Sequence, residues 1–232
     1  MSTLNPTRKV SRRHELREDK VVTAYARALG IFENNRNMVL GIAGGIVLVV
    51  ALILGYAWNQ GRQNETALTE MATAVQRYET GEFQAALDGD ASFAGLVEIA
   101  NRFGGTDSGN LARYYAGDAY FRVGDLDNAL EFFESYSKDA NYLGASAFAG
   151  EASIHELKGD PDKAGDLFAR AARVFESDIT SPMYLESAAR AYVAAGSKSK
   201  AIDAYESIQD DFPASTQARN VEFFLAQLDA TS

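Results

Sequence analysis

The run Met38 to Trp58 constrains this chain more than any other feature. It holds 21 residues and no charged side chain. At about 1.5 Å of rise per residue, a helix of that length covers roughly 30 Å, the thickness of the hydrocarbon core of a bilayer. A helix buried in a soluble core is the alternative, but such helices rarely run this long without a polar face. The run therefore predicts one transmembrane helix over residues 37–60, in contact with the lipid bilayer.

Charge is divided unequally by this predicted span. Residues 1–37 carry a net charge of +4, and the remaining residues carry −14. The positive-inside rule places the basic end in the cytoplasm and the acidic part outside it. A cleaved signal peptide is the rival interpretation, but its charged region would be far too long and no small-x-small cleavage site follows. Tyr56 and Trp58 instead supply aromatic rings for the outer face of the membrane.

Composition excludes several classes of function. The chain has no cysteine, so disulfides, thiol catalysis and cysteine-bound metal are excluded. The part beyond the span is strongly acidic. This argues against nucleic acid as a partner, because a negative surface repels phosphate.

The segments on either side of the span are predicted from composition and periodicity. Residues 1–14 are polar and basic, which is typical of a disordered tail. Residues 15–36 carry apolar side chains at helical spacing, which predicts a cytoplasmic amphipathic helix, either on the membrane surface or without membrane contact. Residues 61–228 are predicted to form an all-helical extracytoplasmic domain, since β-branched alternation is absent. Its first helix is expected to bury one face, made of Leu68, Met71, Ala72, Val75 and Tyr78.

Three glycines, Gly124, Gly159 and Gly196, recur at intervals of 35 and 37 residues. Each is followed five residues later by an alanine and nine residues later by an aromatic residue. We expect each glycine to end a helix with a left-handed cap, the alanine to let the next helix pack closely, and the ring to fill the remaining gap. The pattern predicts a solenoid of helix pairs, with a degenerate earlier copy at Tyr78, Gly81 and Ala86. The alanines are Ala129, Ala164 and Ala201, and the rings belong to Phe133, Phe168 and Tyr205.

The best-preserved positions are Gly117, Tyr120, Ala129 and Phe133 in the first copy and Tyr192, Ala201, Tyr205 and Pro213 in the third. They resemble the tetratricopeptide repeat (TPR) family, whose signature is a small residue, a tyrosine, and then an alanine and an aromatic residue in the second helix. The second copy is weaker, because Ala152 and His155 take the first two positions, and the family's early tryptophan is missing. The resemblance covers about residues 85–213. It implies an all-α fold with one transmembrane helix followed by a TPR-like α-solenoid; an irregular helical bundle is the alternative.

The layout of the whole chain supports a narrower resemblance. A basic N-terminus, an asparagine-rich break at residues 34–37, a single span and a repeat domain follow one another. This resembles the YfgM-type ancillary subunits of the SecYEG translocon and single-span repeat proteins of Bacteroidota-like bacteria. It implies a single-pass protein of the bacterial inner membrane, with a cytoplasmic N-terminus and a periplasmic repeat domain. Its partners would be the SecYEG translocon and periplasmic peptides or chaperones; a scaffold subunit of another cell-envelope complex is the alternative.

No group of residues favours catalysis or metal binding. The two histidines, His14 and His155, lie on opposite sides of the predicted span and cannot share a site. Residues 88–92 read DGDAS, but Phe93 and Ile99 stand where a calcium loop needs glycine and glutamate, so a turn between helices is predicted. The chain is therefore predicted to be no enzyme and to hold no metal and no cofactor.

Two surfaces are predicted to bind partners. In a solenoid of helix pairs, the first helix of each pair lines the concave side. Aromatic anchors beside mixed charges there suit an extended peptide or a partner helix, and plain solvated surface is the alternative. Within the span, small residues four apart let a second helix approach closely, although such pairs also arise by chance. The predicted groove residues are Tyr114, Asp118, Phe121, Arg122, Glu156, Glu186 and Arg190, and the predicted membrane-helix contacts are Gly41, Gly45, Ala51 and Gly55.

Overall fold

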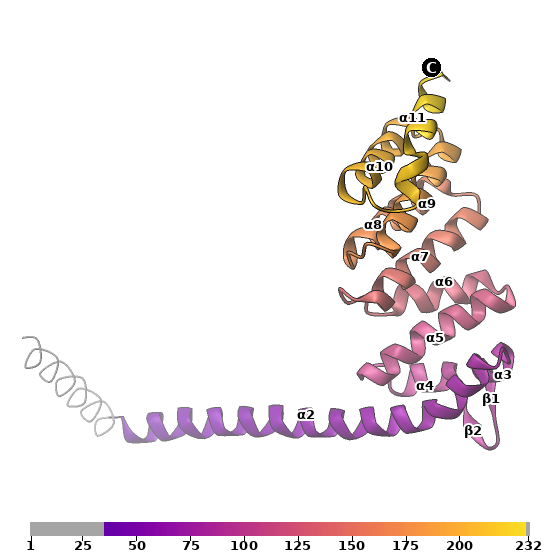
Figure 1. Cartoon of the computed structure of the whole chain (residues 1–232). Coiled ribbons are helices and arrows are strands. Elements are labelled where there is room, and N and C mark those ends of the chain that lie inside the picture. Colours follow the sequence, from indigo (N-terminus) through magenta and orange to yellow (C-terminus); the bar gives the residue numbers. More distant parts are fainter. Residues whose placement is uncertain (1–34, 231–232) are drawn as a thin grey trace, which may run out of the picture. The chain divides into compact units, whose positions relative to one another are not determined.

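The computed structural model describes residues 35–230 of the chain (Figure 1). The predicted tail, residues 1–14, and all but the end of the predicted amphipathic helix, residues 15–36, lie outside the described residues. Contacts divide the chain into two units, Met1–Asn59 and Gln60–Ser232. The described part of the first unit is helical, and the second unit is a stack of helices with one small hairpin.

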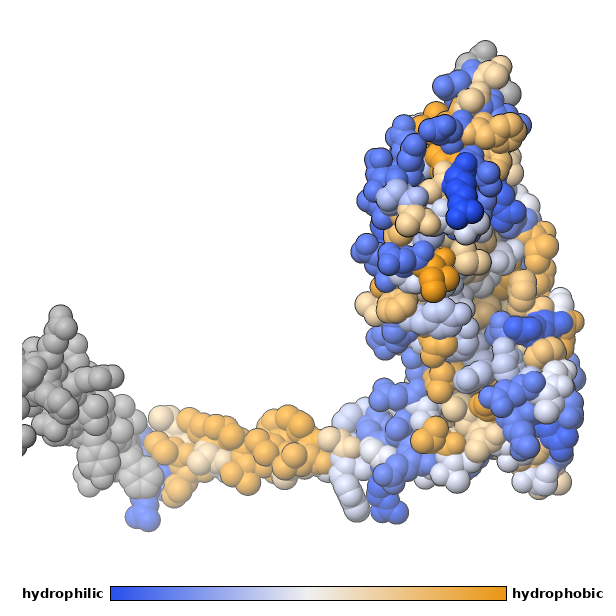
Figure 2. Space-filling model, viewed as in Figure 1, coloured by the Kyte–Doolittle hydropathy of each residue, from blue (hydrophilic) through white to orange (hydrophobic). Residues whose placement is uncertain are grey.

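Helix α2 (Arg36–Glu79) contains the apolar run. None of its side chains between residues 38 and 58 is buried, and the face of the helix shown in Figure 2 is orange to pale orange along this stretch. Within residues 35–230, α2 is the one helix long and apolar enough to cross a membrane. The residues of α2 from Gln60 onward form the first helix of the repeat unit.

The repeat unit continues as successive helix pairs, stacked one after another in Figure 1. Its apolar core is divided into three clusters along the stack, so each pair is held by its neighbours, as in other solenoids. The elements are α3 (Phe83–Asp88), β1 (Gly89–Asp90), β2 (Phe93–Ala94), α4 (Leu96–Arg102), α5 (Asp107–Val123), α6 (Leu126–Ser135), α7 (Tyr142–Leu157), α8 (Pro161–Val174), α9 (Thr180–Ala195), α10 (Lys198–Asp211), η1 (Gln217–Asn220) and α11 (Val221–Ala230).

The repeat glycines end the first helix of each pair, as the spacing predicted. Gly81, Gly124, Gly159 and Gly196 have positive φ values of 83°, 86°, 83° and 74°. At each one the glycine N–H and the following N–H donate to carbonyls of the last helical turn; at Gly124 these bonds are 3.1 Å to Phe121 and 2.9 Å to Tyr120. Glycine adopts this backbone without a Cβ clash. The degenerate copy at Gly81 is therefore confirmed.

Small residues let the paired helices touch. The alanine five residues after each glycine is fully buried in all four copies, from Ala86 to Ala201. The ring of Phe133 lies between two glycines of neighbouring helices, because a Cβ built on Gly117 would fall 2.9 Å from the ring and one on Gly150 would fall 2.7 Å from it. In the next copy, Gly165 makes the same room for Tyr192.

The degenerate copy at Gly81 departs from the pattern after its alanine. Helix α3 ends after six residues, and the strands β1 and β2 pair antiparallel where the second helix would continue. Residues 88–92, predicted to be a turn between helices, thus belong to a hairpin, in which Asp90 accepts a hydrogen bond of 2.6 Å from the Ser92 N–H. Leu96 and Ile99 of α4 are fully buried and supply the core contacts that α3 is too short to make.

One predicted helix face is shifted. Leu68 was predicted to be buried in the C-terminal part of α2, but its side chain is 55% exposed, and Ala72 is exposed as well. The buried residues are Ala67, Met71 and Ala74. These three residues share one apolar cluster with buried residues of α3, α4 and α5. Two of the three are alanines, which the apolar pattern of the sequence did not single out.

Candidate partner-binding groove

We define the groove face by three positions in the first helix of each pair, counted back from its repeat glycine. These positions are occupied by Tyr114, Asp118 and Phe121 in α5, by Ala149, Ser153 and Glu156 in α7, and by Glu186, Arg190 and Val193 in α9. In a solenoid of helix pairs, side chains at these three positions face the concave side. Ala149, Ser153 and Val193 were not singled out from the sequence.

The charged side chains of Asp118 and Arg122 in α5 pair with groups of the same chain. Asp118 accepts a hydrogen bond from the hydroxyl of Tyr78 and pairs with Arg122 at 2.5 Å. The Arg122 guanidinium lies 5.2 Å from the centre of the Phe83 ring. Burial and the Asp118 carboxylate together raise the pKa of Tyr78, so its hydroxyl stays a donor. Asp118 and Arg122 therefore tie α5 to α2 and α3.

The aromatic residues of α5 are half-buried. The Tyr114 hydroxyl lies 2.8 Å from Oγ of Ser146 in α7, and its ring meets Phe133 edge-on with centroids 6.1 Å apart. Burial raises the pKa of Tyr114. Phe121 packs against the same apolar cluster. These two rings join neighbouring pairs and leave only part of their surface to a partner.

The groove face of α7 carries short side chains. Ala149 and Ser153 are half-buried, and the Ser153 hydroxyl donates to the Ala149 carbonyl at 2.9 Å. Glu156 is exposed near the end of the helix. His155 is buried where the other copies have Tyr120 and Tyr192, and burial lowers its pKa. Its position is that of a packing residue, as the repeat predicted.

The groove face of α9 differs from that of α5. Among the described residues, neither Glu186 nor Arg190 has an opposite charge within 4.0 Å; Arg190 reaches only the Ser187 hydroxyl, at 3.4 Å. Apolar side chains flank them. Met183 is 49% exposed and Val193 is 45% exposed. This helix presents both unpaired charge and uncovered apolar surface.

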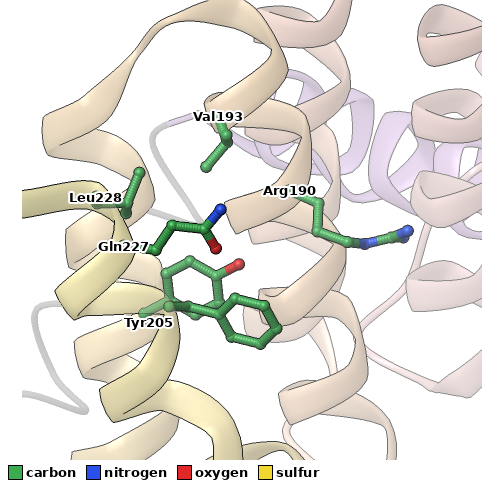
Figure 3. Close-up of a pocket in the computed structure, with 6 residues that line it drawn as sticks. Arg190, Val193, Tyr205, Gln227 and Leu228 are labelled. Atoms are coloured by element: carbon green, nitrogen blue, oxygen red, sulfur yellow. The ribbon is translucent and has the colours of Figure 1, made fainter. Parts of the chain in front are cut away.

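A pocket adjoins the end of this face. Its volume is about 260 Å³, and its lining is mostly apolar. The rings of Tyr205 and Phe224 stack at its base, with centroids 5.2 Å apart. In Figure 3, Val193 of α9 faces Leu228 and Gln227 of α11, while the Arg190 side chain extends away from them. The pocket was not predicted from the sequence, because α11 lies beyond the last repeat and has no place in the repeat pattern. The apolar run Phe223 to Leu225 was the feature that could have indicated it.

A buried ion pair lies outside the groove face. Lys138 Nζ lies 2.7 Å from a carboxylate oxygen of Glu151, and both side chains are about nine-tenths buried. Lys138 also donates to the Tyr136 carbonyl at 3.3 Å, next to the C-terminal end of α6. The pair joins the α6–α7 loop to α7. Within residues 35–230, no three His, Asp or Glu side chains are grouped as metal ligands would be.

The predicted membrane-helix contacts have no neighbour among the described residues. Gly41, Gly45, Ala51 and Gly55 are all exposed on α2. A Cβ built on any of the three glycines would meet nothing within 4 Å. Their contact with a second helix therefore stays a prediction.

Comparison with known proteins supports the repeat assignment. Residues 187–215, which cover most of α9 and α10, match the tetratricopeptide repeat family. Two crystal structures of nearly identical TPR-like repeats attributed to a kinesin light chain of Podosopora anserina, one of them a single-residue variant, are similar in fold. Each has a TM-score of 0.51 at 16% identity over 71% of this chain, and the matched regions cover 85% and 86% of those chains. No curated protein matches the chain.

These matches agree with the geometry of the helix pairs. The predicted fold class is confirmed: the chain is all-α, and its repeat unit is a TPR-like α-solenoid that follows one candidate membrane helix. TPR proteins in general bind partner proteins. The chain is therefore a repeat protein with a TPR-like fold.

Proposed function

We propose that this chain is a single-pass membrane protein whose repeat unit binds partner proteins. The exposed apolar run of α2 carries the proposal. Between residues 38 and 58 the helix has no charged side chain, and none of its side chains is buried. Such a surface is unfavourable in water and favourable in the hydrocarbon core of a bilayer. The span thus anchors the chain, and the repeats supply the binding surface.

The proposed orientation follows from charge. The segment before the span is basic and the segment after it is acidic. We place the N-terminus in the cytoplasm of a bacterium and the repeat unit in the periplasm. Protease added to spheroplasts is then expected to digest the chain after Trp58 and to spare residues 1–30. Protection of the repeat unit would refute this orientation.

The proposed partner is the SecYEG translocon, with periplasmic chaperones or peptides at the groove face. Support comes from the resemblance to YfgM-type subunits and from the two separate surfaces on one chain. The small residues at Gly41 and Gly45 suit a helix contact inside the membrane. Tethering raises the effective concentration of the second contact, so neither contact needs to be tight.

Site-specific photo-crosslinking tests this proposal in native membranes. Crosslinkers at Gly45 and at Met183 are expected to trap subunits of the translocon or of chaperones bound to it. A crosslinker at Glu131, on the second helix of its pair, serves as the control. If the first two positions trap another envelope complex, the chain is a scaffold of that complex. Products that contain only this chain would refute both interpretations.

A further inference from the structure

Two groove-face acids, Asp118 and Glu186, each have an arginine four residues later, and only the second of these pairs is available to a partner. Asp118 and Arg122 are paired with each other and held against α2 and α3. Glu186 and Arg190 are also four residues apart on one helix, yet the structure forms no ion pair between them. A pair that is already satisfied inside the protein gains little from a partner. The recognition charges are therefore those of α9.

A stripe of exposed and half-buried residues runs along α9 from its N-cap residue. Ile179 and Met183 are 75% and 49% exposed, Glu186 is half-buried, Arg190 is exposed, and Val193, which is 45% exposed, ends the stripe. The successive steps are four, three, four and three residues, the spacing that one helix presents to another in a coiled coil. The stripe is about 21 Å long at ~1.5 Å per residue. Residues on the same side of an extended strand lie about 7 Å apart, whereas residues three or four positions apart on a helix lie about 5–6 Å apart. The spacing of the stripe therefore suits a partner helix rather than an extended strand.

The neighbouring helix leaves room beside this stripe. On α7 the groove-face residues Ala149 and Ser153 have short side chains, as does Ser146 one turn earlier, whereas Glu156 near the end of the helix is long and exposed. Helices α7 and α9 share one apolar cluster, in which Ala149 and Ala152 of α7 pack with Leu185 of α9. A helix placed against α9 thus meets small side chains along the first three turns of α7.

From the stripe, the unpaired charges and the adjoining pocket, we propose that α9 docks an amphipathic α-helix of a partner protein. The partner helix carries a basic side chain opposite Glu186 and an acidic side chain opposite Arg190. One turn beyond the acid, a large apolar side chain enters the pocket between Val193 and Leu228, over the Tyr205 and Phe224 rings. This inference rests on the proposed function and names the chemistry of the partner.

Designed peptides test the inference with the full chain in lipid nanodiscs. The first peptide is a fluorescent helix three heptads long, with Leu at the stripe positions and Lys, Glu and one Phe in the proposed order. The second peptide has the Lys and the Glu exchanged. If it bound in the opposite direction, its charges would again face Glu186 and Arg190 correctly, but its Phe would then lie at the wrong end to enter the pocket. The third has the composition of the first with a central proline, which breaks a helix. Fluorescence anisotropy gives the three dissociation constants.

The first peptide is expected to bind about three- to tenfold more tightly than the second, from two exposed ion pairs, and more tightly than the third. The double variant Glu186→Lys/Arg190→Glu is expected to reverse the order of the first two. A matched variant with the same charge changes on second helices, Glu131→Lys/Arg173→Glu, is expected to keep it.

Three results would overturn the inference. They are no binding of either helix to the folded chain, no reversal by the double variant, or equal binding of the proline peptide. The last result would favour an extended ligand and leave the proposed function intact. The proposed function is tested separately, by the crosslinks at Gly45 and Met183.

Discussion

The packing of Phe133 against glycines makes a quantitative prediction about stability. The Phe133 side chain is 2% exposed. A methyl group added at Gly150 would fall 2.7 and 2.8 Å from two carbons of its ring. Because Gly150 lies inside α7, alanine would otherwise be the better helix former there. The substitution Gly150→Ala therefore has two opposing effects, and only one of them depends on Phe133.

The magnitudes follow from these contacts. Forcing a methyl into a filled site costs about 1–3 kcal/mol, and the helix gains about 1 kcal/mol from replacing glycine by alanine. Phe133→Ala alone is expected to cost about 4 kcal/mol, since the glycines beside the ring have no side chains to fill the cavity. In the Phe133→Ala background the clash is gone, so Gly150→Ala is expected to stabilise by about 1 kcal/mol. The coupling energy between the two sites is then about 1–3 kcal/mol.

The measurement is urea unfolding of the full chain in detergent micelles, followed by circular dichroism. Wild type, both single variants and the double variant form one thermodynamic cycle. Gly61→Ala in α2 is the control, because its added methyl meets nothing within 4 Å and should stabilise both backgrounds equally. If the two substitutions add within about 0.5 kcal/mol, the ring does not lie against Gly150 and the repeat packing described above is wrong.

Three further predictions concern the repeat unit. Residues 60–232, expressed without the span, are expected to be soluble and strongly helical by circular dichroism; a random-coil spectrum would show that folding needs the membrane helix. Burial lowers the pKa of His155 below its ordinary value of 6.5, so the unfolded chain takes up a proton first and stability should fall as the pH drops below about 6.5. His155→Tyr should flatten that part of the profile, and an unchanged slope between pH 7 and 5.5 would contradict it. Lys138→Met should cost about 3–5 kcal/mol by leaving Glu151 buried without its partner, whereas Lys138→Met/Glu151→Leu should recover most of the loss; equal losses in thermal melts would show that the pair is not buried.

The order of the helix pairs could be derived from the sequence. Each repeat glycine ends a helix because the left-handed backbone at that position is a local property of glycine. The buried alanine five residues later follows from the same register. The apolar run between Met38 and Trp58 identified a candidate span from composition and length alone, since insertion depends on these two properties. The groove-face positions of each first helix could also be identified by counting back from its repeat glycine.

Tertiary packing decided which of these positions remain available. Asp118 and Glu186 are both acidic groove-face residues with a base four residues on. Asp118 is held by Tyr78, 40 residues away in the sequence, whereas Glu186 has no such partner within residues 35–230. The exposure of Leu68, the hairpin after α3 and the pocket under α11 likewise depend on segments distant in sequence. Local backbone preferences and hydrophobic spacing are written in neighbouring residues, whereas the partner of a charge and the cover over an apolar side chain are set by the close packing of helices that meet only in the folded chain.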